Sequence, residues 1–129
     1  MSDFKRLKVW RKAHALALSA HRVVSGIRGP AHASLRNQLI RAALSIPTNI
    51  VEGRGQKSDL EFCRFLRYSL NSSAELEYHL MVGHEIGAIP DGDYLSLRTQ
   101  TVEVQKMLHG LLARLANDRP DGPNKTDPS

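Results

Sequence analysis

Residues 38–53 read QLIRAALSIPTNIVEG, and the fold follows from this stretch. Its apolar residues recur at steps of three and four, which is the period of one face of an α-helix. The pattern predicts a helix over about residues 33–53 that buries one side in a core. The predicted core row is Leu35, Leu39, Ala42, Ile46 and Ile50.

Pro47 lies in the middle of this predicted helix. A proline has no N–H to donate, so the carbonyl of Ala43 loses its partner and the helix is expected to kink. An interior proline costs about 3 kcal/mol in an isolated helix, and packing must offset this. The residues around it form a candidate structural motif, made of Arg41, Ser45, Pro47, Asn49, Glu52 and Gly53.

The polar residues near Pro47 admit two interpretations. If the helix continues through the proline, one row contains Arg41, Ser45, Thr48 and Glu52. A guanidinium and a carboxylate in one row could serve as an acid/base pair. The structural interpretation is favoured, because Ser, Thr and Asn side chains can bond to carbonyls freed at a kink. In this interpretation Arg41 or Glu52 bridges to a neighbouring helix or subunit.

Three further stretches carry the same helical period, and Gly and Pro punctuate the breaks between them. They predict helices from Phe4 or Lys5 to about residue 26, over 58–86 and over 90–117. Ser58 and Glu61 have the spacing of a capping box. No stretch alternates like a β-strand. The predicted core rows are Val9, Ala13, Leu16, Ala20, Val23 and Ile27; Phe62, Leu66, Ser69, Ser73, Leu76, Leu80 and Gly83; and Leu97, Thr101, Val104, Leu108, Leu111 and Leu115.

Four helices of this length with short connections pack most simply as an antiparallel up-down-up-down bundle. We therefore predict an all-α fold, a four-helix bundle, with one domain over residues 1–117. Residues 118–129 are polar, contain three prolines and have no apolar period, which predicts a disordered polar tail.

Two of the predicted helices carry apolar residues away from their core rows. Such residues can be scattered over the surface of a monomer, which is normal. Rows repeated along a helix are more often a subunit interface, so we predict a homo-oligomer. The predicted interface residues are Ile40, Leu44 and Val51 on one helix and Leu95 and Val102 on another.

Composition and charge narrow the class of protein. The chain has 129 residues, of which 41% are hydrophobic, and this suits one globular domain. A single cysteine, with no signal peptide and no long apolar run, predicts a cytoplasmic protein without membrane attachment. The net charge of +5 divides into +9 over residues 1–57 and −4 over residues 58–129. This asymmetry indicates either an anionic partner or like subunits that meet through opposite charges.

Three cations on the first predicted helix form the candidate nucleic-acid surface. Lys8, Arg11 and Arg22 fall within about 60° of one another on the face away from the core. Small residues beside them would let a phosphate backbone approach closely. A solvated face is the alternative, and Leu18 at its edge could instead mark a protein contact. No aromatic row accompanies the cations, so stacking on bases is not predicted.

No motif for catalysis or metal binding emerges from the residue pattern. Six histidines invite a metal interpretation, but a di-iron bundle needs Glu-x-x-His pairs, and Glu75 and His79 are four residues apart. Residues 53–58 resemble a phosphate-binding loop only loosely, because no strand precedes them. Cys63 is interpreted as a small buried residue. We predict a protein that is not an enzyme and binds no metal or cofactor.

The sequence resembles a family of bacterial four-helix-bundle proteins, some of them encoded in intervening sequences of 23S rRNA genes and classed as S23 ribosomal proteins. The resemblance covers about residues 4–90, and its most specific part is the run SIPTNIVEG at residues 45–53. It implies an antiparallel bundle that assembles into a ring, a pentamer, without catalytic residues. A related branch contains accessory proteins of diversity-generating retroelements. That branch implies RNA or DNA and a reverse transcriptase as partners.

These observations predict a non-enzymatic, oligomeric bundle that binds structured nucleic acid, with RNA favoured, through basic faces repeated around the assembly. The alternative is an oligomeric scaffold or adaptor that binds another protein and uses its charge asymmetry for assembly. Salt distinguishes the two, because phosphate contacts release counterions and their affinity falls steeply as salt rises.

Overall fold

The computed structural model describes residues 3–118, which form four α-helices and two single turns of 3-10 helix. The elements are η1 (Phe4–Arg6), α1 (Lys8–Ser25), η2 (Pro30–His32), α2 (Ala33–Arg54), α3 (Asp59–Glu85) and α4 (Asp91–Asp118). No β-strand occurs over the described residues, and the predicted all-α class is confirmed. The predicted tail lies outside them except for Asp118, which ends α4.

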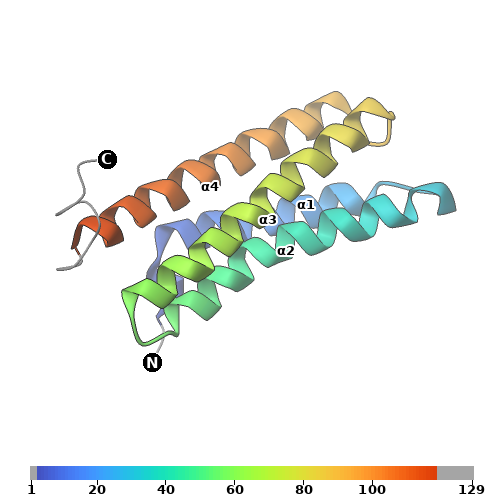
Figure 1. Cartoon of the computed structure of the whole chain (residues 1–129). Helices are drawn as coiled ribbons and strands as arrows, with labels where there is room; N and C mark the ends of the chain where they lie inside the picture. The colour runs from blue at the N-terminus through green and yellow to red at the C-terminus, as the bar shows by residue number, and fades with distance from the viewer. Residues whose placement is uncertain (1–2, 119–129) are drawn as a thin grey trace.

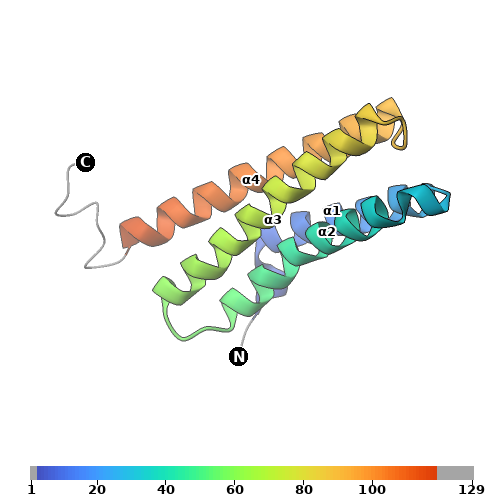
Figure 2. The same cartoon turned by 45° about the vertical axis from the view of Figure 1, so that its right-hand side comes forward.

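The four helices form an antiparallel up-down-up-down bundle. Each helix packs against its neighbours in the chain, and α4 returns to pack against α1, which closes the bundle. The most extensive packing is between α2 and α3. Across the described residues the backbones of the diagonal pairs, α1 with α3 and α2 with α4, do not approach each other closely. Figure 1 shows the long helices running side by side, and Figure 2 shows the same hairpins from a second direction.

Apolar rows of all four helices meet in one core. Every predicted core residue of α3 is buried, including the small residues Ser69, Ser73 and Gly83. In α1 the buried residue after Ala20 is Val24, and the predicted Val23 is only partly buried. The buried row continues at a spacing of four residues there, not three. Three other residues of the predicted core rows are only partly buried, namely Leu35, Leu111 and Leu115. The core residues with no exposed surface include Leu16, Leu39, Ile46, Leu66, Leu76 and Leu108.

The first helix begins later than predicted. η1 is a separate 3-10 turn, and Leu7 is extended, with φ −72° and ψ 122°, before α1 begins at Lys8. The Arg11 guanidinium stabilises this break, because its Nη1 donates to the carbonyls of Lys5 and Arg6 at 3.1 and 3.0 Å. The predicted start at residue 4 or 5 is therefore wrong: side-chain bonds to η1 take the place of a longer helix.

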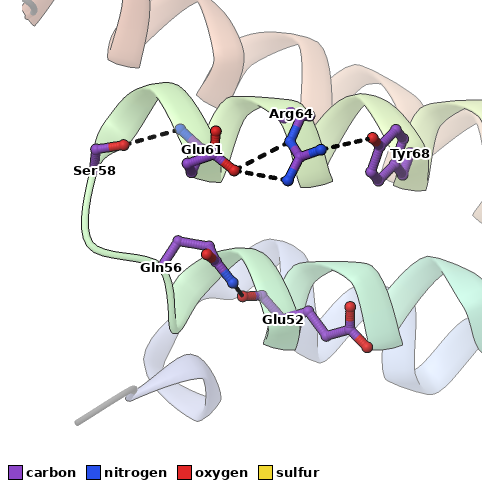
Figure 3. A network of polar contacts seen from close by, with 6 residues as sticks. All are labelled: Glu52, Gln56, Ser58, Glu61, Arg64 and Tyr68. Carbon is purple, nitrogen blue, oxygen red and sulfur yellow. Dashed lines mark hydrogen bonds and ion pairs between the residues drawn. The ribbon is translucent and has the colours of Figure 1, made fainter.

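The turn between α2 and α3 carries the predicted cap and a polar network (Figure 3). The Ser58 hydroxyl accepts a hydrogen bond from the Glu61 N–H at 3.2 Å. A capping box would also have the Glu61 carboxylate accept a hydrogen bond from the Ser58 N–H, and this part of the prediction is wrong. The carboxylate instead accepts two bonds from the Arg64 guanidinium, at 2.7 and 3.1 Å. Arg64 also donates to the Tyr68 hydroxyl at 3.3 Å. The hydrogen bond and charge of Glu61 raise the pKa of Arg64.

Replacing Ser58 by alanine should lower the free energy of unfolding by about 1 kcal/mol, because the first turn of α3 loses its side-chain cap. Chemical denaturation followed by circular dichroism measures this change. Ser34→Ala is the matched control, since Ser34 lies in the first turn of α2 and its side chain makes no hydrogen bond within residues 3–118. The control should shift stability by less than about 0.5 kcal/mol. Equal losses in both variants would contradict a role for the cap.

Candidate functional site

The candidate motif of α2 surrounds Pro47, which is buried inside one continuous helix. Thr48 Oγ1 donates to the Leu44 carbonyl at 2.8 Å, and Asn49 Nδ2 donates to the Ser45 carbonyl at 2.9 Å. These bonds lie one and two residues beyond the carbonyl that the proline leaves free. The side chains therefore bond to carbonyls next to the one that the proline frees and not to the Ala43 carbonyl itself, so their role in the helix is structural, but the predicted pairing with the freed carbonyl does not occur among these bonds.

The same part of α2 is joined to α3 by hydroxyl groups. The buried Ser69 hydroxyl donates to the Ile46 carbonyl at 2.8 Å, and the Ser45 and Ser72 hydroxyls lie 2.7 Å apart and share a hydrogen bond. Small polar side chains let two helix backbones approach while their hydrogen bonds stay satisfied. The contact explains why α3 has serines in its core row.

Gly53 ends the motif at a point where α2 lies close against α3. A Cβ added there would lie 2.7 Å from Phe65 Cβ and 2.9 Å from Phe62 Cδ1. Real Cβ atoms do not approach other heavy atoms this closely, so only glycine fits without a shift of one helix. Gly53 therefore has a packing role.

The two charged members of the motif do not meet. Three turns of helix, about 16 Å, separate Arg41 from Glu52. Arg41 lines a groove of about 350 Å³ between α2 and α3 with Leu44 and Glu75, while the Glu52 side chain lies near the α2–α3 turn (Figure 3). Within residues 3–118 neither forms an ion pair. The acid/base interpretation and the bridge within one subunit are thus not supported, and a bridge to another subunit stays a prediction.

The three predicted nucleic-acid contacts are exposed but lie apart. Lys8 and Arg22 are about 21 Å from each other along α1. The Arg22 guanidinium donates to the Ser19 hydroxyl at 3.0 Å and shares a groove with Asp93 of α4. Arg11 is bound to the η1 carbonyls. Of the three, Lys8 alone makes no hydrogen bond or ion pair among the described residues.

A basic end of the bundle forms only when the chain folds. The start of α1, the end of α2 and the α2–α3 turn lie together at the end that holds the N-terminus (Figure 1), and η1 packs against α1 and α2. Of the acids at this end, Asp3 and Glu61 are paired with Arg6 and Arg64, while the exposed Glu52 and Asp59 form no ion pair within residues 3–118. Reasoning helix by helix missed this grouping, although the basic residues beside each break were a signal. We define the basic end as Lys5, Lys8, Arg11, Arg54 and Lys57.

A groove between α1 and α4 joins cations from both halves of the sequence. This α1–α4 groove has a volume of about 350 Å³. Beside it Lys12 pairs with Glu103 at 3.6 Å across the two helices. The sequence prediction missed Lys106 and Arg114, because they belong to the half whose net charge is negative. The groove is lined by the cations Lys8, Lys106 and Arg114 and by the apolar residues Leu7, Val9, Met107 and Leu111, and within residues 3–118 no carboxylate lines it.

The predicted interface residues lie on two helices that are diagonal in the bundle. Leu44 on α2 and Leu95 on α4 are exposed by 52% and 62%. Ile40, Val51 and Val102 are half-buried. Because α2 and α4 are diagonal in the bundle, the two sets face in different directions and could meet only between subunits. Self-association through them stays a prediction.

Metal-binding clusters and membrane-spanning helices are both absent from the described part of the chain. Among residues 3–118 no three His, Cys, Asp or Glu side chains gather closely enough to hold a metal ion. None of the helices over this range has the length and apolar character needed to cross a membrane. Cys63 is a buried free thiol, as predicted.

The sequence and the structure of the chain were compared with those of known proteins, and both resemble one family. The sequence pattern of the 23S rRNA-intervening sequence proteins matches residues 5–110. The chain belongs to the 23S rRNA-intervening sequence protein family. A crystal structure of a protein of unknown function from the S23 ribosomal protein family of Bacteroides thetaiotaomicron is similar, with a TM-score of 0.76 and 23% identity. The match covers 81% of this chain and 97% of the other. No curated protein matches the sequence.

The resemblance that residues 45–53 carry is thereby confirmed. In this member of the 23S rRNA-intervening sequence protein family, that run places a buried proline, supplies side-chain partners for nearby carbonyls and ends in the glycine against α3. Its most specific stretch of sequence is therefore a packing motif, and the cations lie elsewhere.

Proposed function

We propose that this chain is a self-associating, non-enzymatic bundle that binds structured RNA through the basic end. The grouping of five cations from η1, α1, α2 and the α2–α3 turn is the observation that supports this proposal. Such a cluster attracts phosphates, and its repetition around an oligomer would enlarge the binding surface. The family description, 23S rRNA-intervening sequence protein, favours RNA as the nucleic acid.

Contacts at the basic end would be to phosphates and not to bases. Trp10 lies between Lys8 and Arg11 in α1, and its ring is stacked on His14, with ring centroids 4.8 Å apart and planes 8° apart. Phe4 packs edge-on against Trp10 at 5.0 Å. With its aromatic rings engaged in this way, the surface offers charge without stacking platforms, so little sequence preference is expected.

Removing three cations from the basic end should weaken RNA binding and flatten its salt dependence. We choose Lys5→Ala, Arg54→Ala and Lys57→Ala together, because Arg11 is needed to hold η1 and Lys8 also lines the α1–α4 groove. Each lost phosphate contact lowers the log–log salt slope by about 0.7–0.9, so the slope should fall by about 2 to 3 per engaged subunit. Titration of labelled structured RNA at several salt concentrations measures this.

The matched control removes the same charge away from the basic end, at Arg22, Arg28 and Arg98. It should retain most of the affinity. If both triple variants lost RNA affinity equally, the binding would be a general attraction to a basic protein. If only the control variant lost affinity, the RNA would bind near Arg22 and not at the basic end.

A scaffold that binds another protein is the second candidate function. The exposure of Leu44 and Leu95 favours it, because exposed apolar rows mark protein contacts more often than nucleic-acid contacts. Native protein that binds no structured RNA at low salt would support this candidate over the first.

A further inference from the structure

The outer face of α3 near its C-terminal end combines apolar and acidic side chains. Tyr78 and Met81 are exposed by 58% and 40%, and Glu85 is exposed as well. The three residues follow one another at i, i+3 and i+7, so they form one ridge along the helix. We call Tyr78, Met81 and Glu85 the α3 ridge.

The α3 ridge lies in an acidic part of the molecule. Between Arg67 and Arg98 the sequence contains five carboxylates and no Lys or Arg, although Asp91 is paired with His84 and Arg41 of α2 shares the α2–α3 groove with Glu75. Glu75 and Glu85 are exposed, and within residues 3–118 neither forms an ion pair. Two unpaired carboxylates therefore accompany the exposed apolar side chains of the ridge.

The α1–α4 groove has the complementary character. It offers apolar lining from both helices and three cations, which suits a ridge that presents apolar side chains beside carboxylates. Met107 can adapt its shape to an incoming side chain. Gly110, also in the lining, adds no side chain, and the space where its Cβ would lie has only the tip of Arg114 within 4 Å, at 3.7 Å. A partner can thus approach the α4 backbone.

One subunit cannot bring these two surfaces together by itself. The ridge is on α3, and the groove lies between α1 and α4. α1 is diagonal to α3, and over the described residues their backbones do not approach each other closely. The ridge also lies near the α3–α4 turn, whereas the groove lies toward the opposite end of the bundle, where α1 starts and α4 ends (Figure 1).

We propose that the α3 ridge of one subunit docks in the α1–α4 groove of a second copy of the chain. This inference rests on the self-association in the proposed function and names its interface. Because the two surfaces differ, each contact leaves one ridge and one groove free, so the assembly grows until it closes into a ring or continues as an open chain. A second copy is favoured over residues 119–129, which contain no Leu, Ile, Val, Met or aromatic residue to fill the groove.

Charge reversal tests this contact. Lys106→Glu with Arg114→Glu makes the groove acidic, and Glu75→Lys with Glu85→Lys makes the ridge side basic. In each double variant like charges meet, so light scattering at micromolar concentration should give a mass near the 14.4 kDa of one subunit. A variant with all four changes restores opposite charges and should recover the native mass. Circular dichroism checks that every variant is folded.

The apolar part of the contact has its own matched pair. Tyr78→Ser should raise the concentration needed for half-assembly on the order of tenfold or more, as expected for a buried aromatic anchor. Leu60→Ser alters a side chain of nearly equal exposure, 57%, at the other end of α3 and should leave assembly unchanged.

Each result decides a separate point. Native mass in both double variants, or a four-change variant that stays a single subunit, would overturn the docking of ridge in groove while self-association stands. A native protein that is itself monomeric would overturn both.

Discussion

Ile46→Glu is expected to unfold the subunit. Ile46 has no exposed surface and belongs to the core row of α2. A carboxylate buried there without a partner costs several kcal/mol, which is a large part of the roughly 5–15 kcal/mol that stabilises a typical domain. Circular dichroism should show loss of most helical signal, or a melting temperature far below that of the native protein.

Leu44→Glu, two residues earlier on the same helix, is expected to leave the fold intact. Leu44 is 52% exposed and points away from the core, so the new carboxylate stays hydrated. Leu44 lies outside both the α3 ridge and the α1–α4 groove, so a fall of the mass in solution with the helical signal kept would show that the predicted α2 row forms a second contact between subunits. An unfolded Leu44→Glu variant would show that the two faces of α2 are wrongly assigned.

Sequence and structure agree best where the surroundings of a side chain depend on its own helix. The core rows of α2 and α3 follow from the helical period, because any amphipathic helix must bury its apolar side. The missing N–H of Pro47 predicted side-chain partners for the Ala43 carbonyl, whereas Thr48 and Asn49 bond to the carbonyls of Leu44 and Ser45. Their acceptor carbonyls could not be predicted, because each side chain chooses among several neighbours by its rotamer.

The basic end and the α1–α4 groove could not be predicted, because they depend on how helices pack. Lys8 and Lys106 lie far apart in the sequence, and they line one groove because α1 and α4 are antiparallel neighbours. Lys106 and Arg114 were overlooked because the net charge of their half of the sequence is negative. The sequence also did not show which of two possible partners Glu61 would bind. It accepts a hydrogen bond from Arg64 in the same helix, and the capping box is left incomplete.

Gly53→Ala should lower the free energy of unfolding by about 1–3 kcal/mol, because the added methyl group overpacks the α2–α3 contact. The atom in the way, Phe65 Cβ at 2.7 Å, is fixed to its backbone and cannot rotate aside, so one helix must shift. Gly83 would show a smaller loss, since the atom nearest to its added Cβ, at 2.6 Å, is the flexible end of Ile89. Denaturation followed by circular dichroism compares these variants.

Gly110→Ala is the control for these glycines, because Gly110 lies inside α4 and its added Cβ would make only an ordinary contact, 3.7 Å from the flexible tip of Arg114. Alanine favours the helix there, so this variant should gain about 0.5–1 kcal/mol. The opposite signs at Gly53 and Gly110 separate the cost of overpacking from helix propensity, which favours alanine at both positions. A Gly53→Ala variant as stable as the native protein would mean that α2 and α3 can separate at this point at little cost, and the packing role given to the end of the SIPTNIVEG run would be lost.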